Sequence, residues 1–217
     1  MIIGYREGDI KFDQFRALML RRQQHLKANL DSSTFLHLVA AEIVDLYPET
    51  TIFMTILRDP IQWAKSYLGM LYQFGKEIQQ GKAAFDQSWA ARYGEFQAKG
   101  LNPLRLYERI DDEHYLESVA LSLLEFWTES EIRIFSSVPA DQLFAFRLED
   151  LGQALKMIAK FFQPDFNLAR PAQNFNVASA DDVGQSLIAR SLARCNSDQV
   201  IVKSLSLYRD LSLRIAS

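Results

Sequence analysis

The chain has 217 residues, of which 48% are hydrophobic and 24% are charged, and its formal net charge is -3. These values are typical of a globular protein of one domain, and they exclude collagen-like, low-complexity and disordered chains. The negative charge argues against a dedicated nucleic-acid binder, and one cysteine, Cys195, excludes a disulfide framework or a cysteine-built metal site.

The sequence shows no membrane or export signal. It contains no apolar stretch of about 18 residues, the length that a transmembrane helix needs. Arg6, Glu7 and Asp9 bring charge into the N-terminus too early for a signal peptide. We therefore expect a cytoplasmic protein without a membrane span, and one cysteine is compatible with a reducing compartment.

The N-terminal part is predicted to contain two helices. Residues 9–29 repeat apolar side chains at roughly helical spacing. Asp31, Ser32 and Ser33 are N-cap candidates for a second helix. This helix should end before Pro48, because the residue preceding a proline avoids the helical conformation.

Residues 50–57 (TTIFMTIL) form an uncharged, largely β-branched run, the signature of a central strand that is covered on both faces. Arg58, Asp59 and Pro60 follow directly. Asp is a favoured N-cap and Pro is favoured at the first helical position, so a helix is predicted over 60–80. A helix, a buried strand, a tight turn and a helix in this order belong to a parallel α/β sheet.

The rest of the chain is predicted to be mostly helical. Helices are expected over 83–99, 113–135, from Glu149 and Asp150 to about residue 162, over 181–194 and over 198–214, with an irregular segment over 163–179. Residues 142–147 (QLFAFR) predict a second buried strand. Two strands are few, since an ordinary sheet has about five. Either other strands are short, or part of the sheet is missing from this chain.

Arg58 and Ser66 form the first candidate site. Arg58 follows a predicted parallel strand, at the sheet edge where α/β proteins bind their ligands. A guanidinium can hold a phosphate through two hydrogen bonds, and the start of the next helix adds backbone amides and a positive dipole. Ser66 lies about two helical turns on and offers a further donor. The alternative is that Arg58 pairs with Asp59 or Glu149 and that Ser66 is simply exposed.

Two other polar clusters have plainer interpretations. Glu149 and Asp150 lie where a helix begins and are interpreted as N-capping residues. Lys27 and Asp31, with the adjacent Ser32, Ser33 and Thr34, could line a pocket edge but are expected to form a capping loop. The histidines His25, His37 and His114 show no metal-ligand spacing, so no metal is predicted.

The segment ILRDPIQWAKSY resembles the 3′-phosphate-binding segment of sulfotransferases: an apolar strand, Arg, a turn with Pro, and Ser eight positions after the Arg. Downstream, FWTESEIRIFSSVPADQLFAFRLEDLGQALKMIAKFF is similar to the long helix, strand, R-x-E-D-L turn and closing helix of the same family. DSSTFLHLVAAEIVDLYPETTIFMTILRDP resembles its bacterial branch. The resemblance covers about 27–165, and 166–217 would be a C-terminal helical part.

This resemblance implies one sulfotransferase-like domain over 1–217, with a helix-rich, P-loop-NTPase-like α/β fold whose small parallel sheet is flanked by helices. It implies a transferase that moves a sulfuryl group from 3′-phosphoadenosine 5′-phosphosulfate (PAPS), its co-substrate, to a hydroxyl or amine. Arg58 and Ser66 would then hold the 3′-phosphate. The acceptor and the catalytic base are not identified, and Lys27, Asp31 and His37 are candidates only by neighbourhood. An oligomer is compatible with the sequence.

The chain departs from the family in three respects, one of which is the absence of the C-terminal Gly-rich and Trp-Lys segment of its cytosolic branch. Residues 1–30 contain no loop with Lys and Ser/Thr that would hold the 5′-phosphosulfate, and Leu148 stands where many members carry a Tyr. Three explanations stay open: a sequence that begins after the loop, a site completed differently, or a diverged relative without catalysis. The last is the alternative function, a nucleotide-binding or protein-interaction module.

Overall fold

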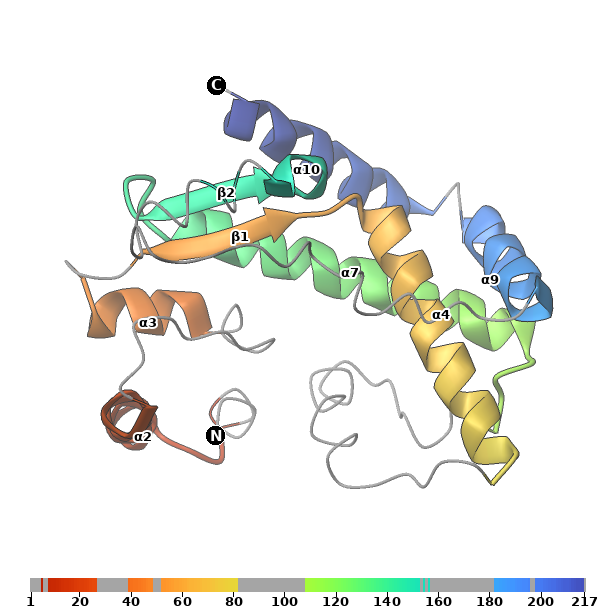
Figure 1. The fold of residues 1–217 in the computed structure, drawn as a ribbon, viewed down its shortest axis with the longest axis horizontal. Coiled ribbons are helices and arrows are strands. Elements are labelled where there is room, and N and C mark those ends of the chain that lie inside the picture. The colour runs from red at the N-terminus through yellow and green to blue at the C-terminus, as the bar shows by residue number, and fades with distance from the viewer. Residues whose placement is uncertain are drawn as a thin grey trace. The chain divides into compact units, whose positions relative to one another are not determined.

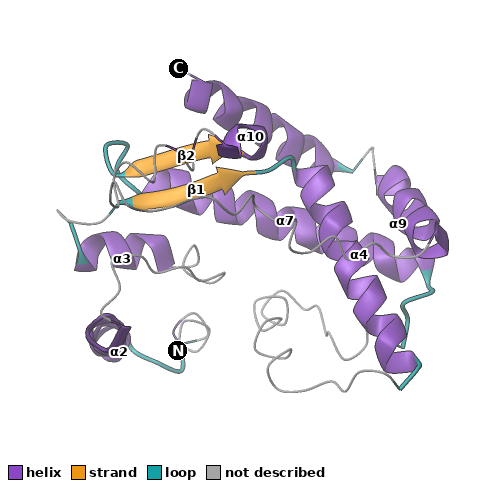
Figure 2. Ribbon diagram, viewed as in Figure 1, coloured by secondary structure: helices purple, strands orange, loops and turns teal. Residues whose placement is uncertain are grey.

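The computed structural model of the chain describes residues 5, 8–26, 39–48, 52–81, 108–152, 154, 156, 182–195 and 198–216. In these residues the protein is mostly helical with a small sheet, as Figure 2 shows. In chain order the elements are α2 (Phe12–Leu26), α3 (Ala40–Leu46), β1 (Phe53–Leu57), α4 (Pro60–Gln79), α7 (Glu113–Ser137), β2 (Leu143–Arg147), the 3₁₀ helix η2 (Leu148–Asp150), α9 (Asp182–Arg194) and α10 (Gln199–Ala216).

The strands β1 and β2 lie side by side and run in the same direction (Figure 1). The backbone amide of Phe53 donates to the carbonyl of Gln142 at 2.8 Å. In a parallel ladder this bond places Phe53 opposite Leu143, so the two strands pair in register and end at the same edge. The predicted pair of parallel strands is thereby confirmed.

The first strand is less covered than its sequence predicts. Leu57 is fully buried, but Ile56 is 42% exposed, and the other residues of β1 are only half-buried. Alternate side chains of a strand point to opposite faces, so Leu57 and Ile56 mark a covered and a less covered face. The expectation of a strand covered on both faces is therefore wrong here. An all-apolar run cannot reveal this, because it looks the same whichever face is covered.

The ends of the helices follow local sequence signals. The carboxylate of Asp59 accepts a hydrogen bond from the backbone amide of Gln62 at 2.8 Å, and Pro60 is the first residue of α4, as predicted. Helix α3 ends at Leu46, shortly before Pro48. The predicted helix over 83–99 and irregular segment over 163–179 lie outside the described residues, as does most of the helix predicted after Asp150.

The chain separates into two compact units. The first consists of Met1–Phe53, Asp86–Pro103 and Glu129–Leu143. Its core joins α2 to α3 through the buried side chains of Phe15, Met19, Val39 and Ile43. The ring of Tyr5 stacks on Phe15 with centroids 4.4 Å apart.

The second unit consists of Met54–Phe85, Leu104–Thr128 and Phe144–Ser217. Helix α4 packs against α9 and α10, and Trp63 of α4 stacks on Phe126 of α7 with ring centroids 6.4 Å apart. On α4 and α7 the buried apolar side chains recur three and four residues apart: Ala64, Leu68 and Leu71, and Leu116, Val119 and Leu123. Helices α9 and α10 add Leu187, Ile188, Ile201 and Leu211 to this core. The prediction of one domain over 1–217 stays a prediction.

A glycine allows α9 to approach α4 closely. A Cβ built on Gly184 would lie 2.6 Å from Cδ1 of the Tyr72 ring and nearer still to Cε1. The Tyr72 side chain is itself fully buried, so it has little room to withdraw.

We expect Gly184→Ala to lower the free energy of unfolding by about 1–3 kcal/mol, the usual cost of overpacking. Gly152→Ala is the matched control, because a Cβ on that helical glycine meets nothing within 4 Å and should be neutral or slightly stabilising. Urea unfolding of the three proteins measures both effects. Equal stability of Gly184→Ala and the parent chain would contradict the close contact.

A carboxylic acid is buried in the first unit. The side chain of Glu131, on α7, is 7% exposed, and among the described residues its Oε2 has no hydrogen-bond partner. Burial raises the pKa of this carboxyl from its ordinary value of 4.5 to about 7.

The folded state therefore keeps a proton on Glu131 between about pH 4.5 and 7 that the unfolded chain releases. Stability should fall as pH rises through this window, by about 3 kcal/mol in total at 1.4 kcal/mol per pH unit. We expect Glu131→Gln to remove this decline, and Glu125→Gln, which removes an exposed carboxyl from the same helix, to leave it in place. Urea unfolding from pH 5 to 8 tests this, and an undiminished decline in Glu131→Gln would contradict it.

Candidate anion site at the carboxyl edge of the sheet

Arg58 lies directly after β1, before the first turn of α4, and its side chain is exposed. Among the described residues it makes no hydrogen bond or ion pair. Parallel strands end at one edge, so Arg58 shares that edge with the residues that follow β2. The structure thus places an exposed cation at the edge where α/β sheets bind ligands.

Each carboxylate near the ends of the two strands has another partner. Asp59 caps α4 through the amide of Gln62. Asp150 accepts a hydrogen bond from Nε of Arg147 at 2.7 Å, and Oε1 of Glu149 accepts a long one, of 3.5 Å, from the hydroxyl of Tyr208. The alternative in which Arg58 pairs with Asp59 or Glu149 is therefore not what the structure contains.

Glu149 and Asp150 belong to η2, directly before the helix that they are predicted to cap. Most of that helix lies outside the described residues, so their capping role stays a prediction. Asp150 also pairs with Arg147, three residues earlier, and this carboxylate raises the pKa of the Arg147 guanidinium.

The exposed side of the first turns of α4 is polar. Gln62, Lys65 and Ser66 are all exposed, and their spacing of three and four residues places them on one face of the helix. Side chains of a helix lean towards its N-terminus, which is where Arg58 lies. Sequence reasoning singled out Ser66 and overlooked Lys65, although its position next to Ser66 and three residues after Gln62 was a usable signal.

Helix α10 adds Tyr208 to this edge. The hydroxyls of Thr128 on α7 and Ser204 on α10 are buried and lie 2.7 Å apart, which joins the two helices. Tyr208 follows Ser204 by one helical turn, and its ring lies against Trp127 with centroids 6.5 Å apart. The hydrogen bond to Glu149 then places the phenol beside the end of β2.

The ionisation of Tyr208 reports its surroundings. Burial raises the pKa of this phenol, and the carboxylates of Glu149 and Asp59 raise it further, while the Ser212 hydroxyl and the Arg147 guanidinium lower it. Tyr208 is therefore electrostatically coupled to groups that follow both strands, and it stays a neutral hydrogen-bond donor at physiological pH. Nothing in the sequence pattern of α10 distinguished this tyrosine from a core residue.

The other candidates from the sequence lie elsewhere. Lys27, Asp31 and His37, with Ser32, Ser33 and Thr34, are outside the described residues. His114 is exposed, with Nδ1 3.7 Å from Oε2 of Glu117.

In the described ranges no three His, Cys, Asp or Glu side chains gather closely enough to hold a metal ion. No helix in that same part of the chain is long and apolar enough to cross a membrane.

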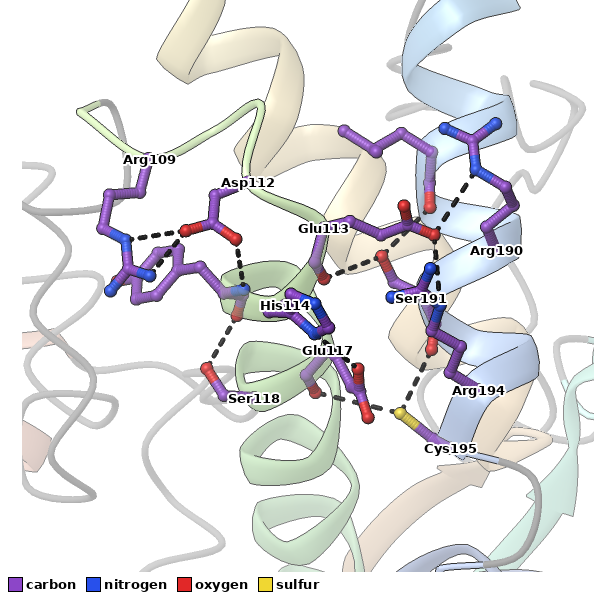
Figure 3. A network of polar contacts seen from close by, with 12 residues as sticks. Arg109, Asp112, Glu113, His114, Glu117, Ser118, Arg190, Ser191, Arg194 and Cys195 are labelled. Carbon is purple, nitrogen blue, oxygen red and sulfur yellow. Dashed lines mark hydrogen bonds and ion pairs between the residues drawn. The ribbon is translucent and has the colours of Figure 1, made fainter.

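A second polar network lies at the N-terminal end of α7, away from the strand ends along that helix (Figure 3). Oε1 of Glu113 forms ion pairs with Nε of Arg190, 3.4 Å away, and with Nε of Arg194, 3.5 Å away. The hydroxyl of Ser191 donates a hydrogen bond to the backbone carbonyl of Glu113. All three partners belong to α9. The network therefore fastens α9 to α7, and its ionic groups are used in that attachment.

Cys195 completes this attachment. Its thiol donates to the carbonyls of Ser191 and Glu117, at 3.2 and 3.9 Å. Burial, with the carboxylates of Glu117 and Asp198, raises the pKa of the thiol to about 11. A thiol that holds its proton at neutral pH is a poor nucleophile, so Cys195 has a structural role.

Comparisons with known proteins found no match to a family model, to a curated protein or to a solved structure. The carboxyl edge of the sheet and the residues that form it are therefore the features from which a function can be inferred.

The N-cap of α4 is the first testable part of this edge. Asp59→Ala removes the acceptor for the Gln62 amide and should lower the free energy of unfolding by about 1 kcal/mol. Asp59→Ser is the matched control, because serine also caps helices and should retain most of this stability. Urea unfolding distinguishes the two variants. A loss of equal size in both would show that the carboxylate acts other than as a cap.

Proposed function

We propose that this protein is a sulfotransferase that binds PAPS and transfers its sulfuryl group to a hydroxyl or amine acceptor. The observation that carries the proposal is the exposed Arg58, without a partner among the described residues, between a parallel strand and the first turn of α4. This is the arrangement that the resemblance to sulfotransferases implies for the 3′-phosphate. A P-loop-like fold and a cytoplasmic location are parts of the same proposal.

Each group at this edge would have a distinct role. The Arg58 guanidinium would hold the 3′-phosphate through charge-assisted hydrogen bonds. The first turn of α4 would contribute little, because Pro60 has no amide hydrogen and the amides of Gln62 and Trp63 bond to Asp59. The hydroxyl of Ser66 would add a neutral donor, and Lys65 a second positive charge on the same helical face. The reaction would be an in-line transfer: the acceptor oxygen or nitrogen bonds to sulfur while the S–O bond to adenosine 3′,5′-bisphosphate breaks and that bisphosphate leaves. A base takes the acceptor proton, and cations stabilise the sulfuryl charge.

The second candidate function is nucleotide binding without catalysis. It is favoured by one observation, the absence from residues 1–30 of a loop with Lys and Ser/Thr for the 5′-phosphosulfate. The two functions share the 3′-phosphate site and differ in turnover. Consumption of PAPS in the presence of hydroxyl and amine acceptors would support the enzyme, and binding without turnover would support the module.

The anion site is tested by calorimetric titration with adenosine 3′,5′-bisphosphate. A charge-assisted contact to phosphate contributes about 1.5–3 kcal/mol, so Arg58→Ala should weaken binding roughly ten- to a hundredfold. Ser66→Ala removes one neutral donor and should weaken it about fivefold. Arg16→Ala is the charge-matched control, because Arg16 is an exposed residue of α2 in the other unit.

Melting curves confirm that each variant folds. No binding by the parent chain at millimolar bisphosphate would contradict both candidate functions. Binding that is equally strong in Arg58→Ala and Arg16→Ala would leave nucleotide binding in place but would place the phosphate elsewhere.

A further inference from the structure

Arg58 is an exposed arginine with carboxylates at its own strand end and at the neighbouring one. Asp59 is the next residue in the chain, and Glu149 lies just past the position that faces Arg58 across the sheet, because Phe53 pairs with Leu143 and the register continues to the strand ends. Glu149 and Asp59 both act on the Tyr208 phenol, so Glu149 lies near Asp59, the residue next to Arg58 in the chain.

Something must therefore keep Glu149 from neutralising Arg58. Asp59 is engaged by the Gln62 amide, and Asp150 by Arg147. The carboxylate of Glu149 is exposed, and it raises the pKa of the Arg147 guanidinium, which is itself hydrogen-bonded to Asp150. The contact of Glu149 is the hydroxyl of Tyr208, which comes from the last helix of the chain.

We infer that Tyr208 is a positioning residue which, by donating its hydroxyl to Glu149, keeps that carboxylate away from Arg58 and leaves the guanidinium available to an anion. The ring of Tyr208 is held by Trp127, and its helix is held by the buried Thr128 and Ser204 pair, so the hydroxyl is presented from a fixed support. This role depends on the proposed anion site, and α10 thereby becomes part of that site.

The physical consequence concerns the Glu149 carboxylate. Without the hydroxyl, Glu149 can pair with Arg58, and an anion must then displace a carboxylate of the protein before it binds. Replacing Glu149 by Gln removes the competing charge, so the hydroxyl of Tyr208 is no longer needed. A tyrosine that merely supported α10 would gain nothing from that second substitution.

The binding experiment is calorimetric titration of adenosine 3′,5′-bisphosphate into the parent chain, Tyr208→Phe, Glu149→Gln and the double variant. Tyr208→Phe should weaken binding about three- to tenfold, the size expected for one exposed ion pair or hydrogen bond. The double variant should bind as the parent chain does, within about twofold. Tyr115→Phe, on the first turns of α7, is the matched control and should leave affinity unchanged. Unchanged affinity in Tyr208→Phe, or a loss that Glu149→Gln does not relieve, would overturn the inference.

A second measurement needs no ligand. Melting midpoints of Arg58→Ala, Glu149→Gln and their combination are compared in the parent chain and in Tyr208→Phe. In the parent chain the two changes should add, and in Tyr208→Phe they should be coupled by about 1–3 °C, because the freed carboxylate pairs with Arg58. Additivity in both backgrounds, or coupling in the parent chain, would overturn the inference. These melting outcomes test the role of Tyr208 even if the parent chain binds no bisphosphate. A failure to bind bisphosphate would contradict the proposed function and would leave the role of Tyr208 to this second measurement.

Discussion

The parallel pairing of β1 with β2 is the constraint on which the candidate site depends. The hydrogen bond from Phe53 to Gln142 joins segments almost ninety residues apart in the chain and sets them in register. Parallel strands in register end together, so Arg58 and the turn after Arg147 come to one edge. The helices then determine which of the charged groups at that edge are already engaged.

The polar groups at this edge are distributed among partners in a way that follows from simple electrostatics. A carboxylate is stabilised by a helix N-terminus, by a guanidinium or by a hydroxyl, and Asp59, Asp150 and Glu149 each use one of these. Arg58 is the cation that this distribution leaves available among the described residues. Arg190 and Arg194 differ from Arg58 in this respect, because both pair with Glu113 and thereby attach α9 to α7.

The second unit supports the edge through helix contacts of two kinds. Close approach of α9 to α4 is possible because Gly184 presents no side chain to Tyr72. Attachment of α10 to α7 uses the buried hydroxyls of Thr128 and Ser204, whose pairing satisfies two polar groups that would otherwise be costly to bury. Both contacts involve small residues, and small residues carry little weight in a search for hydrophobic periodicity.

The sequence by itself determined the local structure around the site. The apolar runs ending at Leu57 and Arg147 predicted both strands, Asp59 and Pro60 predicted the start of α4, and Arg58 was singled out before any contact was known. These features depend on residues that are close in the chain, so local conformational propensities are enough to predict them. Only the tertiary structure decided which face of β1 is covered, that Asp150 pairs with Arg147, and that Tyr208 meets Glu149. These are contacts for which several partners compete, and the packing of distant segments selects among them.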